Sequence, residues 1–283
     1  MTVSFGDTLE RVFDERGRLC VGIDPHVFLL RAWGLGDDAA GLREFGLRVV
    51  DAAAGRAGIV KPQVAFFERH GSAGYAALEE VIAAARAAGL VVIADAKRGD
   101  VGTSVEAYGE AWLHPGSALE ADAVTLNAFQ GVGSIAAPLD LAREHGKGVF
   151  VLAATSNPEA AGYQTATIGS GADSGKSVAR GIVAEVTRWN TQSGTAGLGS
   201  AGVVLGATVS LADYGIDPSE LAAHRTPILA PGFGHQGARI SDLQSLYGAA
   251  SGLVIVSASR SILGAGPDGI TTAISDHATE ARL

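Results

Sequence analysis

Eight short apolar runs recur along the chain, each followed by a turn-forming or polar residue and then by a segment with helical character. The runs are rich in Val, Ile and Leu without polar alternation, which is typical of strands buried on both faces of a parallel sheet. Between them, residues 75–88 are rich in Ala, and residues 177–189 repeat apolar residues at intervals of three and four. This alternation predicts right-handed β-α-β units. The runs lie at 19–23, 58–61, 90–94, 123–126, 148–152, 202–205, 227–230 and 253–256.

Eight strands in 283 residues favour a (β/α)8 barrel, whose typical size is roughly 250 residues. An open doubly wound sheet is the alternative, because residues 232–237 fit the pattern GxGxxG directly after the seventh run. That match falls at the wrong strand, and no acidic residue ends a following strand about 20 residues on, as a dinucleotide site needs. We therefore predict an α/β fold, a (β/α)8 TIM barrel forming one domain over residues 1–283.

Three further segments have patterns that predict their structure or role. The polar, Gly-rich connection 156–176 is too long for a simple turn, and connections of that length are usually functional or disordered. The connection 24–38 has an apolar centre that predicts a short helix, and the N-terminal segment reads as an amphipathic helix. Both long connections follow strands at the end where a barrel carries its active site.

Composition excludes several classes of protein. With 47% hydrophobic and 18% charged residues the chain can bury a large core, which excludes disordered and collagen-like chains. The net charge of −9 disfavours nucleic acid as a partner. The single cysteine, Cys20, excludes an intramolecular disulfide and fits a reducing, cytoplasmic location. There is no paired Cys or His spacing for a metal and no apolar stretch suited to a membrane. Glycine is enriched, at 39 residues, which indicates tight turns and close backbone approach.

Ionisable residues end three consecutive predicted strands. Asp95 and Lys97 follow the third apolar run and share a face, because side chains two residues apart in a strand point the same way. Asp100 follows in the loop, and Asp24 and Lys61 end the first and second strands. At the carboxyl ends of barrel strands these groups would gather at one mouth. Taken one at a time, these residues also fit a purely structural role as solvated surface charges or turn-forming residues.

The third-strand pattern DxKxxD, followed by VGTS at 101–104, resembles the orotidine 5′-phosphate decarboxylase family. The form DAKRGD departs from family members that have a bulky apolar residue after the lysine, and is similar to the longer bacterial branch. The likeness covers nearly the whole chain in order. It includes LCVGIDPH at the first strand, IVKPQ at the second, ATSNP at 154–158, APGFGHQG at 230–237 and SASRSIL at 257–263.

The resemblance implies a carboxy-lyase that converts orotidine 5′-phosphate to uridine 5′-phosphate in de novo pyrimidine biosynthesis, with no metal and no organic cofactor. Lys97 would stabilise and protonate the carbanion at pyrimidine carbon 6. Asp95 would disfavour the substrate carboxylate, and Lys61 would join the charge network. Asp100 would belong to the same catalytic set.

The resemblance also implies the substrate contacts. Asp24 and Lys61 match ribose ligands, and Ser156 matches a pyrimidine contact. Phosphate ligands are implied at Gln236 and Arg260, with help from Gly234 and from backbone N–H groups near Ser259. Asp100 and Ser104, where the family usually has Thr, match residues donated across a homodimer interface. Among the histidines, His235 in the phosphate loop is the one with a candidate role.

Two alternatives remain open at this point. A magnesium-dependent keto-sugar phosphate decarboxylase of the same superfamily shares DxKxxD but has an acidic residue at the end of the second strand, where this chain has Lys61. A non-catalytic barrel that binds a phosphorylated ligand is the second, since a fold does not determine a function. The presence of all the charged residues together with Arg260 disfavours it.

Overall fold

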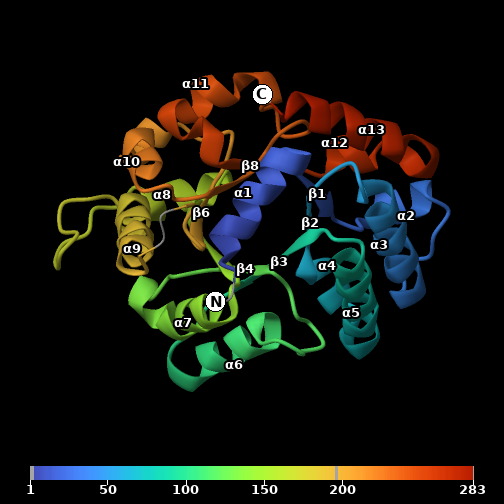
Figure 1. Cartoon of the computed structure of the whole chain (residues 1–283), viewed down its shortest axis with the longest axis horizontal. Coiled ribbons are helices and arrows are strands. Elements are labelled where there is room, and N and C mark those ends of the chain that lie inside the picture. The colour runs from blue at the N-terminus through green and yellow to red at the C-terminus, as the bar shows by residue number, and fades with distance from the viewer. Residues whose placement is uncertain (1–2, 195–196, 283) are drawn as a thin grey trace.

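A computed structural model describes residues 3–194 and 197–282. Eight parallel strands form a closed barrel in sequence order, and β8 pairs with β1 (Figure 1). The predicted (β/α)8 barrel is confirmed, and the open-sheet alternative is wrong. The strands are β1 Leu19–Ile23, β2 Ile59–Pro62, β3 Val91–Arg98, β4 Ala123–Leu126, β5 Gly148–Ala154, β6 Ala201–Leu205, β7 Ile228–Pro231 and β8 Val254–Ala258.

Helices surround the barrel, and short helical turns occupy several of the loops (Figure 1). The connection 24–38 contains the predicted short helix, α2. The connection 156–176 contains α8, and its Thr167 forms an antiparallel bridge with Ser177, the residue that follows the connection. The helices are α1 Phe5–Arg16, α2 Val27–Ala32, α3 Ala39–Ala53, α4 Val64–Glu68, α5 Gly71–Ala87, α6 Gly102–Leu113, α7 Ala136–His145, α8 Ala161–Gln164, α9 Val178–Gln192, α10 Pro218–Ala223, α11 Leu243–Tyr247, α12 Arg260–Leu263 and α13 Gly266–Glu280. Among the described residues, none of these helices combines the length and apolarity needed to span a bilayer.

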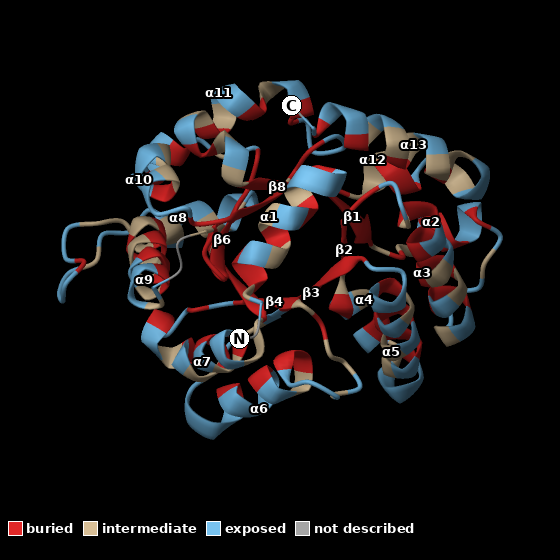
Figure 2. Cartoon of the chain, in the orientation of Figure 1, coloured by how far each residue is buried: buried red, intermediate tan, exposed pale blue. Residues whose placement is uncertain are grey.

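The strands are buried on both faces, which explains their continuous apolar runs (Figure 2). Side chains alternate along each strand between two clusters: Cys20 points into the barrel, whereas Val21 packs against the surrounding helices. Burial raises the pKa of the Cys20 thiol to about 12, so this cysteine behaves as a small apolar residue.

Helix α1 closes the amino-terminal end of the barrel, and its buried stripe faces the strands (Figures 1 and 2). Phe5 meets Phe150 of β5 edge to face, with ring centroids 6.0 Å apart. Glycine permits this contact, because a Cβ on Gly148 would lie 2.4 Å from the Phe5 ring, and a Cβ on Gly58 would lie 2.3 Å from Val12. Part of the glycine excess therefore serves close packing at the closed end.

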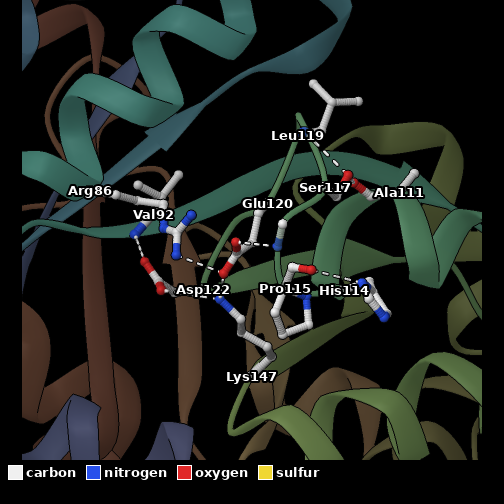
Figure 3. A network of polar contacts seen from close by, with 11 residues as sticks. Arg86, Val92, Ala111, His114, Pro115, Ser117, Leu119, Glu120, Asp122 and Lys147 are labelled. Atoms are coloured by element: carbon white, nitrogen blue, oxygen red, sulfur yellow. Dashed lines mark hydrogen bonds and ion pairs between the residues drawn. The ribbon is translucent and has the colours of Figure 1, made fainter.

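A polar network ties β3, β4 and β5 together where these strands begin (Figure 3). Glu120 accepts from Lys147 at 2.8 Å and from Arg86 at 2.6 Å, while Asp122 accepts the N–H of Val92 at 2.8 Å. Lys147 and Glu120 are 8% and 12% exposed, so this ion pair is largely shielded from solvent. Burial alone would raise the pKa of Glu120, but the hydrogen bonds from Lys147, Gly116 and Arg86 outweigh burial and lower it to about 2.

We predict that Glu120→Gln lowers the free energy of unfolding by about 2–3 kcal/mol at neutral pH, because it leaves the buried Lys147 ammonium without its main partner. A carboxyl whose pKa is lowered by folding stabilises the protein above its ordinary pKa, and that contribution disappears as the pH falls toward 2. The difference between the two proteins should therefore shrink between pH 5 and pH 2 in urea unfolding. Glu15→Gln, which breaks the exposed pair with Arg11, serves as the control. An equal difference at pH 3 and pH 7 would contradict this account.

Candidate active site

A pocket of about 260 Å³ opens at the carboxyl ends of the strands, opposite α1. Polar side chains from β2, β3, β4 and β8 and from the segments after β1, β5, β7 and β8 line it. Eight of the eleven site residues predicted from the sequence lie here: Asp24, Lys61, Asp95, Lys97, Ser156, Gln236, Ser259 and Arg260. The structure thus brings together groups that are as much as 236 residues apart in the chain.

Asp95 occupies the centre of the charged set and accepts four side-chain hydrogen bonds. Its Oδ2 accepts from the Lys61 ammonium at 2.9 Å and from the Gln63 amide at 2.9 Å. Its Oδ1 accepts from the Lys97 ammonium at 2.6 Å and from the Thr125 hydroxyl at 2.9 Å. The Lys61 and Asp95 side chains are only 8% and 10% exposed, whereas Lys97 is 45% exposed toward the pocket opening.

The two buried partners keep each other charged. Burial alone would raise the pKa of Asp95, but the Lys61 and Lys97 ammonium groups outweigh burial and hold that pKa well below its ordinary value. Burial alone would lower the pKa of Lys61, but the carboxylates of Asp95 and Asp24 raise it above its ordinary value. The pocket therefore presents a fixed carboxylate between two ammonium groups.

Sequence reasoning missed two residues of this set, Gln63 and Thr125. Gln63 lies two positions after Lys61 and shares its face, so strand periodicity could have found it. Thr125 is the one polar residue of the run AVTL, a signal that the sequence did carry. Its hydroxyl accepts the backbone N–H of Lys97 at 3.0 Å while donating to Asp95, which links the two charged residues through β4.

The part of the pocket near β1 and β8 has polar atoms free for a ligand. Within the described part of the chain, Asp24 Oδ1 and Ser259 Oγ are buried without a hydrogen-bond partner. Ser259 approaches β1 closely, since a Cβ on Gly22 would lie 2.7 Å from the Ser259 Cβ. Buried polar atoms are normally satisfied, so Asp24 Oδ1 is suited to accept from a ligand hydroxyl, and Ser259 Oγ is suited to donate to an anionic or hydroxyl group.

The loop after β7 approaches the loop after β5. Ser156 Oγ lies 3.5 Å from Gln236 Oε1, and both line the pocket together with His235. Gly234 belongs to the loop after β7 but does not line the pocket, and its N–H donates to the Ala238 carbonyl at 2.8 Å. Its φ of 76° is left-handed, and a Cβ there would lie 2.5 Å from Ser261 Oγ.

Asp100 and Ser104 also lie outside the pocket of this single chain. Asp100 Oδ1 accepts the N–H of Val101 at 2.8 Å just before α6, and Ser104 is exposed in the first turn of that helix. Val101, next to Asp100, is 52% exposed, and Phe129, in the loop after the neighbouring strand β4, is 83% exposed.

The described residues contain no group of three or more His, Cys, Asp or Glu side chains arranged to hold a metal ion. In the pocket, the two carboxylates face ammonium groups rather than further carboxylates or imidazoles. The donor set is therefore one that binds an organic anion more readily than a divalent cation.

The chain was compared with known families and proteins. The model of the "Orotidine 5′-phosphate decarboxylase / HUMPS family" matches residues 17–273. Two curated relatives are named orotidine 5′-phosphate decarboxylase. That of Salinispora tropica is 48% identical over 265 residues, covering 94% of this chain and 91% of the relative. That of Corynebacterium efficiens is 47% identical over 283 residues, covering 99% and 98%.

Solved structures agree with these relatives. A crystal structure from Streptomyces avermitilis superposes with a TM-score of 0.91 at 45% identity, over 100% of this chain and 96% of that one. The Leishmania donovani OMP decarboxylase superposes with a TM-score of 0.73 at 29% identity, covering 99% of both chains. The family model and these near-complete matches show that the chain belongs to the orotidine 5′-phosphate decarboxylase family of carboxy-lyases.

Proposed function

We propose that this protein decarboxylates orotidine 5′-phosphate to uridine 5′-phosphate in de novo pyrimidine biosynthesis, without a metal or an organic cofactor. The observation that carries the proposal is the Asp95 carboxylate held ionised between the Lys61 and Lys97 ammonium groups at the base of the pocket. Decarboxylation at pyrimidine carbon 6 requires a group that disfavours the substrate carboxylate and a cation where negative charge develops. Asp95 and Lys97 supply these two functions.

Asp95 raises the energy of the bound substrate. Two like unit charges about 4 Å apart repel by roughly 4 kcal/mol at an effective dielectric constant of about 20. Asp95 cannot relieve that repulsion by taking up a proton near neutral pH, because its pKa is held far below its ordinary value. The repulsion is still a fraction of the roughly 8–23 kcal/mol by which enzymes lower barriers. The remainder must come from interactions that strengthen in the transition state.

Lys97 supplies such an interaction. Its ammonium lies at the partly open edge of the pocket, 2.6 Å from Asp95 Oδ1. As carbon dioxide leaves, the electron pair of the broken C–C bond stays on carbon 6, and the ammonium stabilises that charge. Lys97 then donates a proton to carbon 6, which forms the C–H bond of the product and leaves a neutral amine that recovers its proton from solvent.

The rest of the pocket is suited to hold the nucleotide. The buried, unpartnered Oδ1 of Asp24 and the Lys61 ammonium fit ribose hydroxyls, and Ser156 fits the pyrimidine. Arg260 can contact two phosphate oxygens at once, with Gln236 and the backbone near Ser259 as further donors. Gly234 contributes to the shape of the loop after β7, since its N–H donates to Ala238 of the same loop.

The alternatives fit the pocket less well. A magnesium-dependent keto-sugar phosphate decarboxylase needs an acidic residue at the end of β2, and this chain has Lys61 there, bonded to Asp95. A non-catalytic phosphate-binding barrel has no use for a buried carboxylate held between two ammonium groups, an arrangement that is costly to desolvate.

We further propose a homodimer in which Asp100 and Ser104 reach the pocket of the partner. Both lie outside the pocket of their own chain, beside the exposed Val101 and on the same side as the exposed Phe129. Contact with a second copy of the chain would cover these exposed apolar side chains. A cytoplasmic location and a single functional domain over residues 1–283 belong to the same proposal.

We predict that Lys97→Ala lowers turnover of orotidine 5′-phosphate by at least about 10³-fold, because it removes the cation and the proton donor together. Binding of uridine 5′-phosphate should remain measurable by calorimetry. Lys176→Ala, which breaks an ion pair with Asp173 outside the pocket, should leave turnover unchanged. Unchanged turnover in Lys97→Ala would refute the role of Lys97, and loss of native turnover with a chelator would refute the metal-free reaction.

Arg260→Ala should weaken binding of uridine 5′-phosphate by about 10- to 100-fold, because a charged hydrogen-bonded pair is lost. Binding of the unphosphorylated nucleoside should change little, and calorimetry with both ligands checks this. Arg239→Ala, which breaks an exposed pair with Asp242, is the matched control. Equal weakening toward nucleotide and nucleoside would contradict a phosphate contact.

Mixing two inactive variants tests the shared site. In a heterodimer of Lys97→Ala and Asp100→Ala, one of the two pockets contains an intact Lys97 and receives an intact Asp100 from the other chain. Subunit exchange should therefore restore activity in about one quarter of all sites. Activity that stays at the level of the separate variants, although exchange is shown to occur, would contradict the crossed arrangement.

A further inference from the structure

Arg98 follows Lys97 directly and has no part in the reaction described above. Where the resembling family members have a bulky apolar residue, this chain has an arginine whose side chain lies among α4, α5 and α6. We propose that Arg98 is a positioning residue: it holds the bulged end of β3 so that the Lys97 ammonium stays against Asp95. The proposal rests on the function proposed for Lys97.

The end of β3 is irregular where Lys97 lies. Ala94 pairs with Val124 and Arg98 with Leu126, so three residues of β3 lie opposite the single residue Thr125 of β4. Such a bulge redirects side chains and interrupts the strand pairing. Within it Lys97 has a φ of 49°, in the left-handed region that non-glycine residues rarely adopt. A conformation of this kind persists only where the surroundings hold it.

Contacts from the inner side hold part of the bulge. The Thr125 hydroxyl accepts the Lys97 N–H and donates to Asp95 Oδ1, so it fixes the backbone of the lysine and the carboxylate together. This hydroxyl cannot restrain the outer side of the bulge. There the Ala96 carbonyl belongs to the stretch of β3 that has no register partner on β4, and a buried carbonyl of this kind is normally hydrogen-bonded.

Arg98 supplies that donor. Its Nη1 donates to the Ala96 carbonyl at 3.1 Å, just before Lys97, and its own carbonyl accepts the N–H of Asn127 at 2.7 Å, just after Lys97. Arg98 thus makes one hydrogen bond to the residue before Lys97 and, through its own carbonyl, one directly after Lys97. Because the guanidinium is planar and rigid, its orientation fixes the position of the Ala96 carbonyl.

The guanidinium is itself fixed by three helices. Its Nη2 donates to Glu68 Oε1 of α4 at 2.7 Å and to the Tyr75 hydroxyl of α5 at 3.2 Å, and it lies 5.9 Å from the centre of the Tyr108 ring of α6. Glu68 is 43% exposed, and exposed ion pairs contribute little to stability. We therefore expect these contacts to fix the position of the Arg98 guanidinium more than they stabilise the fold. Their loss should lower activity without a large loss in the free energy of unfolding.

The test is the Arg98→Met variant, which keeps an unbranched apolar stem and removes every donor. We expect kcat for orotidine 5′-phosphate to fall on the order of 10- to 100-fold, because the Lys97 ammonium is misplaced. The kcat is expressed per active site, with the sites counted by titration with a tight-binding nucleotide. The dissociation constant for uridine 5′-phosphate should stay within about threefold, because the contacts expected to bind the nucleotide are intact. Arg43→Met, which breaks a more solvent-exposed pair with Glu80 between α3 and α5, is the control and should change neither quantity.

A second variant tests positioning directly. In Arg98→Ala, free guanidinium ion at millimolar concentration can occupy the space beside Glu68 and donate to the Ala96 carbonyl. We expect it to restore part of the lost kcat, and to leave Arg43→Ala unaffected. If Arg98→Met does not fold, Tyr75→Phe and Glu68→Gln loosen the same guanidinium, and each should lower kcat without changing nucleotide affinity.

Three results would overturn the inference: an unchanged kcat per site in Arg98→Met, an equal loss of nucleotide affinity, or no response of Arg98→Ala to guanidinium. Failure of the proposed function is recognised separately, because the unaltered protein would then not decarboxylate orotidine 5′-phosphate. In that event a crystal structure of Arg98→Met tests the positioning role. An unchanged positive φ at Lys97 together with an unchanged contact to Asp95 overturns the inference. A Lys97 that has lost the positive φ or the contact to Asp95 supports it.

Discussion

The contact on which the site depends is the Asp95 carboxylate bonded to two ammonium groups at the end of β3. A buried charge is costly unless it is paired and hydrogen-bonded, and here each oxygen of Asp95 has one ammonium and one neutral donor. Three neighbouring strands must end in register for these bonds to form. The closed barrel supplies that register, because parallel pairing sets where each strand ends relative to the next.

The two ends of the barrel are built for different tasks. At the closed end, α1 fills the opening with apolar side chains, and the polar groups around Glu120 satisfy one another. At the open end, Asp24 and Ser259 each have a buried polar atom without a partner in the described chain. Stability and ligand binding are therefore separated along the barrel axis, as is common in this architecture.

Most of the fold could be predicted from the sequence, because strands buried on both faces leave continuous apolar runs that mark all eight strands. Eight site residues could be placed in one pocket for a related reason: they lie at the carboxyl ends of strands or in the segments just after them. The bulge of β3 could not be predicted, since it depends on tertiary contacts to Thr125 and to the helices that hold Arg98. The lack of room for a side chain at Gly234 likewise depends on Ser261, 27 residues further along the chain.

The pairing of β8 with β1 joins the first and last strands, which are farthest apart in the sequence. Asp24 follows β1 and Arg260 follows β8, so the pocket straddles this junction. A nucleotide that contacts both residues can bind only after the last strand has closed the ring. Its binding energy then counts toward ring closure, and the protein should become more resistant to unfolding as the concentration of nucleotide rises above its dissociation constant. The concentration of such a nucleotide would then affect how long the chain stays folded.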